Sequence, residues 1–427
     1  MNHKKNGPPR SHVAFDKLFQ ASKDGNIVLL EAVLGSTAVD INQVGCNGKT
    51  ALFHAISAQH TKVVHLLLKY GADVHQASFV SHHRDFVGSQ LSCCDELPII
   101  TAARVGSVDI VFTLLEAGAN PNVQSLCHAH NGGMKVTNDK TPLHFACQHS
   151  SDEMVILLLR YEAKVNIRDK QKELPLHIAV RCKQCPKQNR IIKALCSHYS
   201  DVNAVNKIEC SPLYLASFYG CNTKVELLLS HGADIDQCSE RESSYGTALH
   251  IAAVKDRTPL AWLLISHGAK LALRNGLQYT PLQLNINTHS TSEVASMLIY
   301  HGANMDGVDK FGYTVLSACI RNMRLDCERL ARLAVCAGYD LRQDKWLHLM
   351  DDNKQGTAQC QGVMSNTPEI PIPSGRVLQL CQWLRQRQTN ASALTDLCRV
   401  VIRKVLSTSV AGRSIVCGGD IVVVCIK

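Results

Sequence analysis

The sequence predicts an all-α solenoid, in which short helix pairs stack on one another. The first reason is repetition, because one phrase recurs over most of the 427 residues, and the steps between copies that start at 141 and 174, and at 247 and 280, are 33 residues each. A repeat of this length is typical of folds that stack one small unit many times. The second reason is composition: 45% of the residues are hydrophobic, whereas only 5% are aromatic. Such a core suits thin helices that pack through Leu, Val, Ile and Ala.

The phrase occurs in about nine copies. They span residues 15–42, 50–75, 97–122, 141–166, 174–203, 211–236, 247–272, 280–306 and 314–341. The first and last copies are degenerate, as expected for the end caps of a stack whose members share their apolar faces. The array therefore covers residues 15–341 and follows a flexible N-terminus at 1–14.

Each copy opens with signals for a first helix. A Thr or Ser at the head can accept a backbone N–H bond and cap this helix. A proline in the next position fits the first turn, where a missing N–H costs little. The predicted caps are Thr141, Ser211, Thr247 and Thr280, and the prolines are Pro142, Pro212 and Pro281. We expect the histidines of this helix, His54, His144, His177 and His250, to make local hydrogen bonds rather than bind metal.

A second, returning helix follows in each copy. Its packing face is illustrated by Val225, Leu227, Leu228 and Leu229. A glycine then stands where the helix must end in a left-handed residue, a conformation that glycine adopts cheaply. These glycines are Gly71, Gly118, Gly232, Gly268 and Gly302.

The phrase "TPLHxA…LLLxxGADVN" resembles the ankyrin repeat, and the resemblance covers residues 15–341. It implies antiparallel helix pairs stacked into a curved solenoid, with turn fingers that project on one side. It also implies a binding scaffold for a target protein, whose identity the fold alone does not name.

Two insertions interrupt the regular spacing, at residues 76–96 and 123–140. Insertions in repeat proteins map to loops, commonly on the binding face. One hypothesis is that they are a pair of specificity loops. The alternative is neutral drift in loops that tolerate extra length.

Asparagines close the turn after the second helix in three copies. Asn122, Asn166 and Asn203 each follow a leucine by eight residues, and these leucines are Leu114, Leu158 and Leu195. The resemblance implies that such asparagines can be hydroxylated by an intracellular dioxygenase. The alternative is a structural turn asparagine that tolerates a left-handed backbone.

Signatures of catalysis are missing from the sequence. It contains no P-loop, dinucleotide fingerprint, nucleophile elbow or HExxH motif, so we predict no enzyme and no cofactor. Two groups of residues are candidate zinc ligands: Cys182 and Cys185 with Cys196 and His198, and His82 and His83 with Cys93 and Cys94. Neither supplies a clear set of four converging ligands, so no metal is predicted.

The charge and the cysteine content of the sequence indicate in which compartment the protein works and which classes of partner to expect. The net charge of +9 is spread along the chain without a run of like charges, which predicts no nucleic-acid partner. Nineteen irregularly spaced cysteines favour a reducing interior over a disulfide framework. Since the sequence has no signal-peptide core and no apolar run long enough to span a bilayer, we expect a cytoplasmic protein, with the nucleus as an alternative, and no membrane partner.

The pattern changes after the array. Residues 342–374 form a predicted linker rich in proline near its end, and residues 375–427 carry new helical patterns. Within 392–406 an apolar stripe recurs at helical spacing, formed by Leu394, Leu397, Cys398, Val401, Ile402 and Val405. This helix must bury its stripe, either against the last repeat or in a groove on a partner.

The stretch "ALTDLCRVVI" resembles the BC box that opens a SOCS box, through Ala393, Leu394, Cys398 and Ile402. With the array before it, the chain resembles the ankyrin repeat and SOCS box family. The resemblance implies that the stripe docks on Elongin C of the Elongin B/C pair, with Leu394 as the anchor. It further implies recruitment of a cullin–RING ubiquitin ligase to a target held by the repeats. The tail at 407–427 is atypical and contains no Leu-Pro-Leu-Pro cullin box, so a scaffold or decoy that recruits no cullin is the alternative.

Overall fold

The computed structural model describes most of the repeat array. The described residues are 10–36, 39–45, 48–82, 92–129, 139–181, 186–238, 246–288, 293–305, 308–309, 313–321, 327–336 and the single residues 339, 341 and 384. Internal contacts divide the chain into two units, at 1–237 and 238–427, and we describe each unit by itself.

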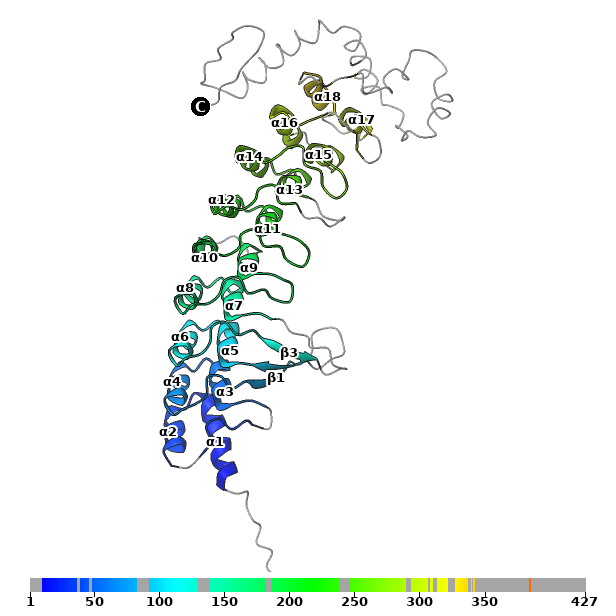
Figure 1. The fold of residues 1–427 in the computed structure, drawn as a ribbon. Helices are drawn as coiled ribbons and strands as arrows, with labels where there is room; N and C mark the ends of the chain where they lie inside the picture. The colour runs from blue at the N-terminus through cyan, green and yellow to red at the C-terminus, as the bar shows by residue number, and fades with distance from the viewer. Residues whose placement is uncertain are drawn as a thin grey trace, which may run out of the picture. The chain divides into compact units, whose positions relative to one another are not determined.

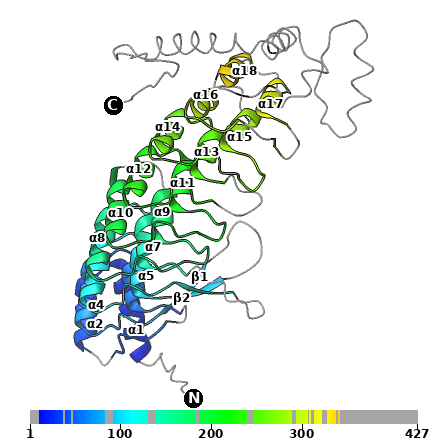
Figure 2. The same cartoon turned by 45° about the horizontal axis from the view of Figure 1, so that its top comes forward.

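The first unit contains six helix pairs among its described residues. They are α1 (Arg10–Asp24) and α2 (Ile27–Ser36), α3 (Ala51–Ser57) and α4 (Thr61–Lys69), α5 (Pro98–Val105) and α6 (Val108–Glu116), α7 (Pro142–Gln148) and α8 (Asp152–Arg160), α9 (Pro175–Arg181) and α10 (Pro186–Ser197), and α11 (Pro212–Tyr219) and α12 (Asn222–Ser230). The first helices pack on one another in one row and the second helices in another, as Figures 1 and 2 show. Helix α1 begins at Arg10, ahead of the predicted start of the array at residue 15.

The second unit repeats this arrangement. Its described pairs are α13 (Ala248–Val254) and α14 (Thr258–Ser266), α15 (Pro281–Thr288) and α16 (Glu293–Tyr300), and α17 (Val315–Arg321) and α18 (Cys327–Cys336). The nine described pairs of the two units match the nine predicted copies. None of the described helices has the length and apolar character that a bilayer crossing requires.

Local sequence explains where the helices begin. The Ser211 side chain accepts the Tyr214 N–H and caps α11, and Thr280 accepts the Gln283 N–H in the same way at α15. At α7 and α13 the caps Thr141 and Thr247 form capping boxes with a histidine three residues later. The predicted caps are therefore confirmed, with the histidine as an unforeseen partner at two of them.

The predicted left-handed glycines are also confirmed, with φ between 81° and 89° at all five positions. Two repeats depart from the rule, because Glu162 and Tyr199 occupy the equivalent place with φ of 61° each. A side chain in this conformation costs about 1 kcal/mol.

The core lies between the two rows of helices. Many alanines of the first helices are completely buried, which lets neighbouring repeats approach closely; among them are Ala55, Ala102, Ala146, Ala179, Ala216 and Ala252. On α12 Val225 and Leu228 are fully buried, whereas Leu227 and Leu229 are half-buried. Lys224 of the same helix is also completely buried, and its Nζ donates to the Val180 carbonyl at 2.9 Å, near the end of α9.

The all-α prediction needs a correction at the two insertions. They contain the strands β1 (Ser78–His82), β2 (Ser92–Glu96) and β3 (Leu126–Ala129), which form an antiparallel sheet in the order β1-β2-β3. Strand β2 pairs with both neighbours, so the first insertion forms a hairpin and the second adds a strand to it. Helical periodicity cannot reveal such pairing, because β3 meets β2 across the intervening pair α5 and α6.

Candidate interaction surface on the finger side

The turns that precede the first helices project on one side of the first unit, which we call the finger side. Figure 1 shows these turns on the side of α5, α7, α9 and α11, away from α6, α8, α10 and α12. Figure 2 shows that the sheet extends on this same side. Three successive fingers are described at residues 139–141, 167–174 and 204–211.

The base of the sheet is tied to the helices. The buried Ser78, at the start of β1, lies with its Oγ 3.1 Å from Thr50 Oγ1, and Thr50 caps α3. Glu96, at the end of β2, accepts two hydrogen bonds from the Arg104 guanidinium, at 2.7 and 3.1 Å. The N–H of Ser125, just before β3, donates to the Lys140 carbonyl at 2.9 Å, and the Lys140 N–H donates to Ser125 Oγ at 3.2 Å. Such anchors make the insertions part of the fold, which favours the specificity-loop hypothesis without testing it.

The register of the sheet shows which residues of one candidate zinc site stand opposite each other on neighbouring strands. Cys93 stands opposite His128 and Cys94 opposite Cys127, whereas His82 stands opposite Ser92. His83 lies outside the described residues. Among the residues that the structure describes, no three His, Cys, Asp or Glu side chains are placed to share a metal ion.

Of the other zinc candidate, Cys182 and Cys185 lie outside the described residues. Cys196 is half-buried on α10, and burial raises the pKa of its thiol to about 11. His198 Nδ1 lies 2.9 Å from the Ala194 carbonyl of its own helix. A thiol with a raised pKa is a poor thiolate ligand near neutral pH.

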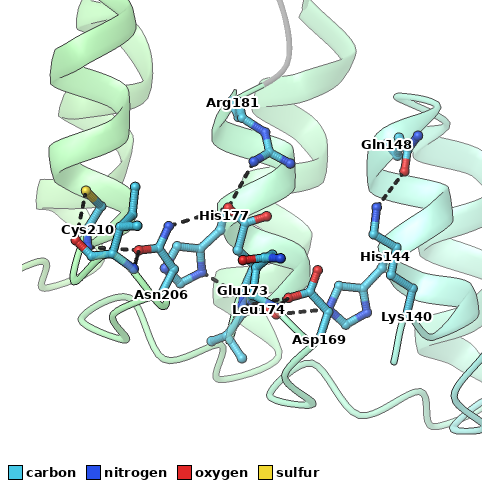
Figure 3. Close-up of polar contacts among 12 residues, drawn as sticks. Lys140, His144, Gln148, Asp169, Glu173, Leu174, His177, Arg181, Asn206 and Cys210 are labelled. Atoms are coloured by element: carbon cyan, nitrogen blue, oxygen red, sulfur yellow. Dashed lines mark hydrogen bonds and ion pairs between the residues drawn. The ribbon is translucent and has the colours of Figure 1, made fainter. Parts of the chain in front are cut away.

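Buried histidines connect successive fingers, and Figure 3 shows His144 and His177 beside the finger that contains Asp169 and Glu173. His177 Nδ1 accepts the Leu174 N–H at 3.1 Å, and its Nε2 lies 3.1 Å from the Ala204 carbonyl of the next finger. Because a backbone N–H can only donate and a carbonyl can only accept, the proton of the neutral ring is on Nε2.

The same two contacts recur in two other repeats. His144 joins Thr141 N to the Glu173 carbonyl, and His250 joins Thr247 N to the Tyr279 carbonyl. The predicted hydrogen-bonding role is confirmed for these three residues. His54 falls one position later in its repeat, where it packs edge-on against Phe19 and Phe53.

Burial makes these rings resist protonation. The pKa values of His144, His177 and His250 are each lowered to about 4, chiefly because burial disfavours the charged form. The carbonyl partners raise the pKa values, by a smaller amount. The neutral rings are therefore structural cross-links at physiological pH.

Sequence reasoning missed an acid or amide that shapes four of the described fingers. Asp169 Oδ1 accepts the Gln171 and Glu173 N–H groups, and Asn206 Oδ1 accepts those of Ile208 and Cys210. Asn275 and Asp309 hold the equivalent place in the second unit. The signal was present, because each of the four stands five residues before the head of its first helix.

A buried carboxylate organises the finger before α9. Glu173 is 5% exposed, and its Oε1 accepts Arg181 Nη1 at 2.9 Å and Asn206 Nδ2 at 3.4 Å, as shown in Figure 3. Arg181 thus reaches back from the end of α9 to the finger side. Glu96 and Arg104 repeat this pairing at α5, while Lys140 and Gln148 form the equivalent contact at α7.

The three turn asparagines link each repeat to the next. Asn122, Asn166 and Asn203 each accept a backbone N–H from the following repeat, at 2.6, 2.9 and 2.8 Å. Their Nδ2 groups donate to carbonyls of the same turns. The asparagines therefore have a structural role between repeats, although none of the three has the left-handed backbone that the alternative named. Hydroxylation stays a prediction.

The predicted Elongin-binding residues lie outside the described part of the chain. These are Leu394, Leu397, Cys398, Val401, Ile402 and Val405. The linker at 342–374 and the tail at 407–427 lie outside it as well. Within the predicted SOCS box region at 375–427 the structure describes Leu384.

Comparison with known proteins identifies the repeats. A family model for ankyrin repeats matches three times, over residues 18–125, 99–206 and 187–275, and so covers more than half of the chain. This chain belongs to the ankyrin repeat family. Ankyrin repeats are typically non-enzymatic modules for protein–protein interaction.

Several known proteins are similar to parts of this chain. An ankyrin repeat protein of fowlpox virus is 28% identical over 138 residues, which are 32% of this chain and 17% of the viral protein. The human transient receptor potential cation channel subfamily A member 1 is 24% identical over 334 residues, 71% of this chain and 28% of the channel. The mouse neurogenic locus notch homolog protein 1 is 30% identical over 145 residues, 34% of this chain and 6% of its own length. The ankyrin chain thus spans less than a third of the length of each relative.

Among solved structures, the ankyrin repeat domain of Bcl-3 is 24% identical. The similarity covers 59% of this chain and 99% of that domain, with a TM-score of 0.45.

Proposed function

We propose that this chain is the substrate-recognition subunit of an Elongin B/C–cullin–RING ubiquitin ligase. In this proposal the ankyrin repeats hold a target protein on the finger side. The helix at 392–406 recruits Elongin C, and the complex promotes ubiquitination and degradation of the target. The chain itself is not catalytic.

The observation that carries the proposal is the apolar stripe after the array. Its BC-box-like residues Ala393, Leu394, Cys398 and Ile402 follow nine ankyrin repeats and a proline-containing linker. An amphipathic helix with such a stripe suits a groove on a partner. The fold supports the other half of the proposal, because the first unit presents a sheet and a series of fingers on one side.

The decisive experiment is co-purification of the full chain with Elongin B/C. Leu394→Asp places a charge in the proposed apolar contact and should weaken Elongin C binding by at least about tenfold. Thr395→Asp is the matched control, because it adds the same charge on another face of the predicted helix and should leave binding intact. Equal binding of both variants and the unmodified chain would refute the assigned Elongin site.

A second function is supported by the tail. Because no Leu-Pro-Leu-Pro segment follows residue 406, the chain is also a candidate for a scaffold or decoy that binds its target without recruiting a cullin. Reconstitution with a cullin–RING core separates the two functions. Ubiquitin chains on a bound target would eliminate the decoy, whereas stable target binding without chains would favour it.

A further inference from the structure

Basic side chains of three successive fingers, together with one from the end of α9, lie on the finger side of the first unit. We call this group the basic finger surface, and it consists of Lys140, Arg168, Lys170, Lys172, Arg181 and Lys207. Lys140 is half-buried and the other five are exposed. Along the sequence these basic residues do not stand out, because the net positive charge is spread over the whole chain. The fold brings them to one side.

The carboxylates of the same fingers are less accessible. Asp169 and Glu173 are buried, at 6% and 5% exposure, and both accept hydrogen bonds within the fingers. Asp139 and Glu209 are half-buried. A partner that approaches this side therefore meets the cationic groups first, and their combined field favours an acidic partner.

Hydrogen bonds between fingers hold the backbone of this surface in place. Arg168 Nη1 donates to the Val205 carbonyl at 2.6 Å, and the Lys207 N–H donates to the Gln171 carbonyl at 2.7 Å. On the other side, Gln124 Nε2 donates to the Arg168 carbonyl at 3.1 Å. A surface whose backbone is already ordered loses less entropy when it binds.

One of the lysines sits in a conformation that disfavours a side chain. Lys172 has φ of 54°, at the place that Gly48 occupies with φ of 75° in the finger before α3. Glycine would adopt this conformation more easily. Asp139 and Glu209 hold the equivalent place in the neighbouring fingers with φ of 50° and 61°, so the conformation belongs to the finger turn and fixes where each of these side chains begins.

We propose that the basic finger surface binds an extended acidic segment of a partner protein, with a carboxylate at about every third residue. Neighbouring helices pack about 8–10 Å apart, and an extended chain advances about 3.3 Å per residue. One finger-to-finger step therefore corresponds to about three residues. The inference rests on the proposed function only in assigning target binding to the repeats, and it does not depend on Elongin.

A protein segment fits this surface better than a nucleic acid. A nucleic-acid strand carries a phosphate charge about every 3.4 Å, which is closer than the fingers are spaced. Asp139 and Glu209 stand among the cations and would repel such dense charge. Ile208 is 55% exposed beside Lys207 and offers an apolar contact to a protein side chain.

The test uses the full chain and three fluorescent probes of equal charge, followed by fluorescence anisotropy. The first probe is a peptide with Glu at every third position, the second has the same composition with its Glu residues contiguous, and the third is a single-stranded oligonucleotide. The reversal variant combines Lys170→Glu, Lys172→Glu and Lys207→Glu. Glu209 occupies in its own finger the place that Lys172 has, so Glu at this position is compatible with the fold.

The control variant carries the same change of charge elsewhere in the first unit. It combines Lys62→Glu, Lys69→Glu and Lys193→Glu, which are exposed on α4 and α10. We expect the first peptide to bind the unmodified chain most tightly, and the reversal variant to bind it at least about tenfold more weakly. The control variant should stay within about twofold of the unmodified chain. Circular dichroism and unfolding midpoints verify that both variants are folded.

Several outcomes would overturn the proposal. Failure of the unmodified chain to bind the first peptide would refute the proposed acidic segment. Equal losses in the two variants would show that only general charge matters. Equal affinity for the two peptides would refute the spacing. Tighter binding of the oligonucleotide, lost in the reversal variant, would assign the surface to nucleic acid. An unaffected Elongin interaction in Leu394→Asp would refute the Elongin site and leave this inference standing.

A single substitution separates binding from stability. Lys172→Gly removes one cation and relieves the left-handed backbone, so we expect a higher unfolding midpoint together with about threefold weaker peptide binding. Unchanged binding would mean that Lys172 has no part in the surface.

Discussion

The first turns of α13 and α15, neighbouring repeats of the second unit, meet the same requirement with different side chains. At α13, His250 Nδ1 accepts the Thr247 N–H at 3.1 Å, and at α15, Gln283 Oε1 accepts the Thr280 N–H at the same distance. His250 also reaches the Tyr279 carbonyl at 3.0 Å, in the finger that leads to α15. Either side chain therefore satisfies the N–H of the threonine that caps the helix. The histidine adds a bond between repeats and a buried group that can titrate.

The largest effect is expected when this cross-link is removed altogether. His250→Ala takes away the acceptor for Thr247 N–H and the donor to the Tyr279 carbonyl, both in a buried environment. We expect the free energy of unfolding to fall by about 2–4 kcal/mol. Urea unfolding followed by circular dichroism measures the loss. A change within experimental error would show that water or another side chain replaces the ring.

The next largest effect is expected from acid, which should lower the free energy of unfolding through the three buried histidines. Above pH 6.5, the ordinary pKa of histidine, the ring is neutral in both states and its stabilising contribution is complete. Between pH 6.5 and about 4 the unfolded chain binds a proton that the folded chain does not, so stability falls as the pH falls. Each of the three buried histidines contributes about 1.4 kcal/mol per pH unit in this window.

Unfolding midpoints between pH 7 and pH 4 test this sign. The matched variant is His250→Gln. Its free energy of unfolding should fall less with falling pH, by the contribution of one histidine. An identical dependence in the variant would mean that His250 does not titrate on unfolding.

A smaller loss of stability is expected for His250→Gln at neutral pH. Gln283 shows that a glutamine can accept the N–H of the capping threonine in this fold. We expect a loss of about 1 kcal/mol, since the cap survives and the cross-link to Tyr279 is perturbed. A loss as large as that of His250→Ala would show that the cross-link, rather than the cap, carries the stabilisation.

The smallest loss of stability is expected when the hydroxyl of Thr247 is removed. Thr247→Ala should cost only about 0.5 kcal/mol, because His177 accepts the N–H of Leu174, a residue without a hydroxyl, at the same 3.1 Å. A loss above about 2 kcal/mol would instead place the hydroxyl at the centre of the cap.

Local signals in the sequence account for much of this fold. The heads Ser211 and Thr280, the prolines behind them and glycines such as Gly232 act within a few residues, and all lie where the sequence predicts them. Their effects come from backbone conformation and short hydrogen bonds, which depend on little beyond neighbouring residues. The histidines are predictable as hydrogen-bonding residues for the same reason, although their partners in the next repeat are not.

The sequence by itself determined the solenoid, its nine helix pairs and the two places where it is interrupted. Only the tertiary structure joined the insertions into a sheet, because β2 finds β3 across a complete helix pair. It likewise assembled the cations of Lys140, Lys172 and Lys207 on one side, since residues of three different repeats become neighbours only when the repeats stack. The repeats can be predicted because their signals lie within a few neighbouring residues. A surface cannot, because it forms by contacts between segments that are far apart in the sequence.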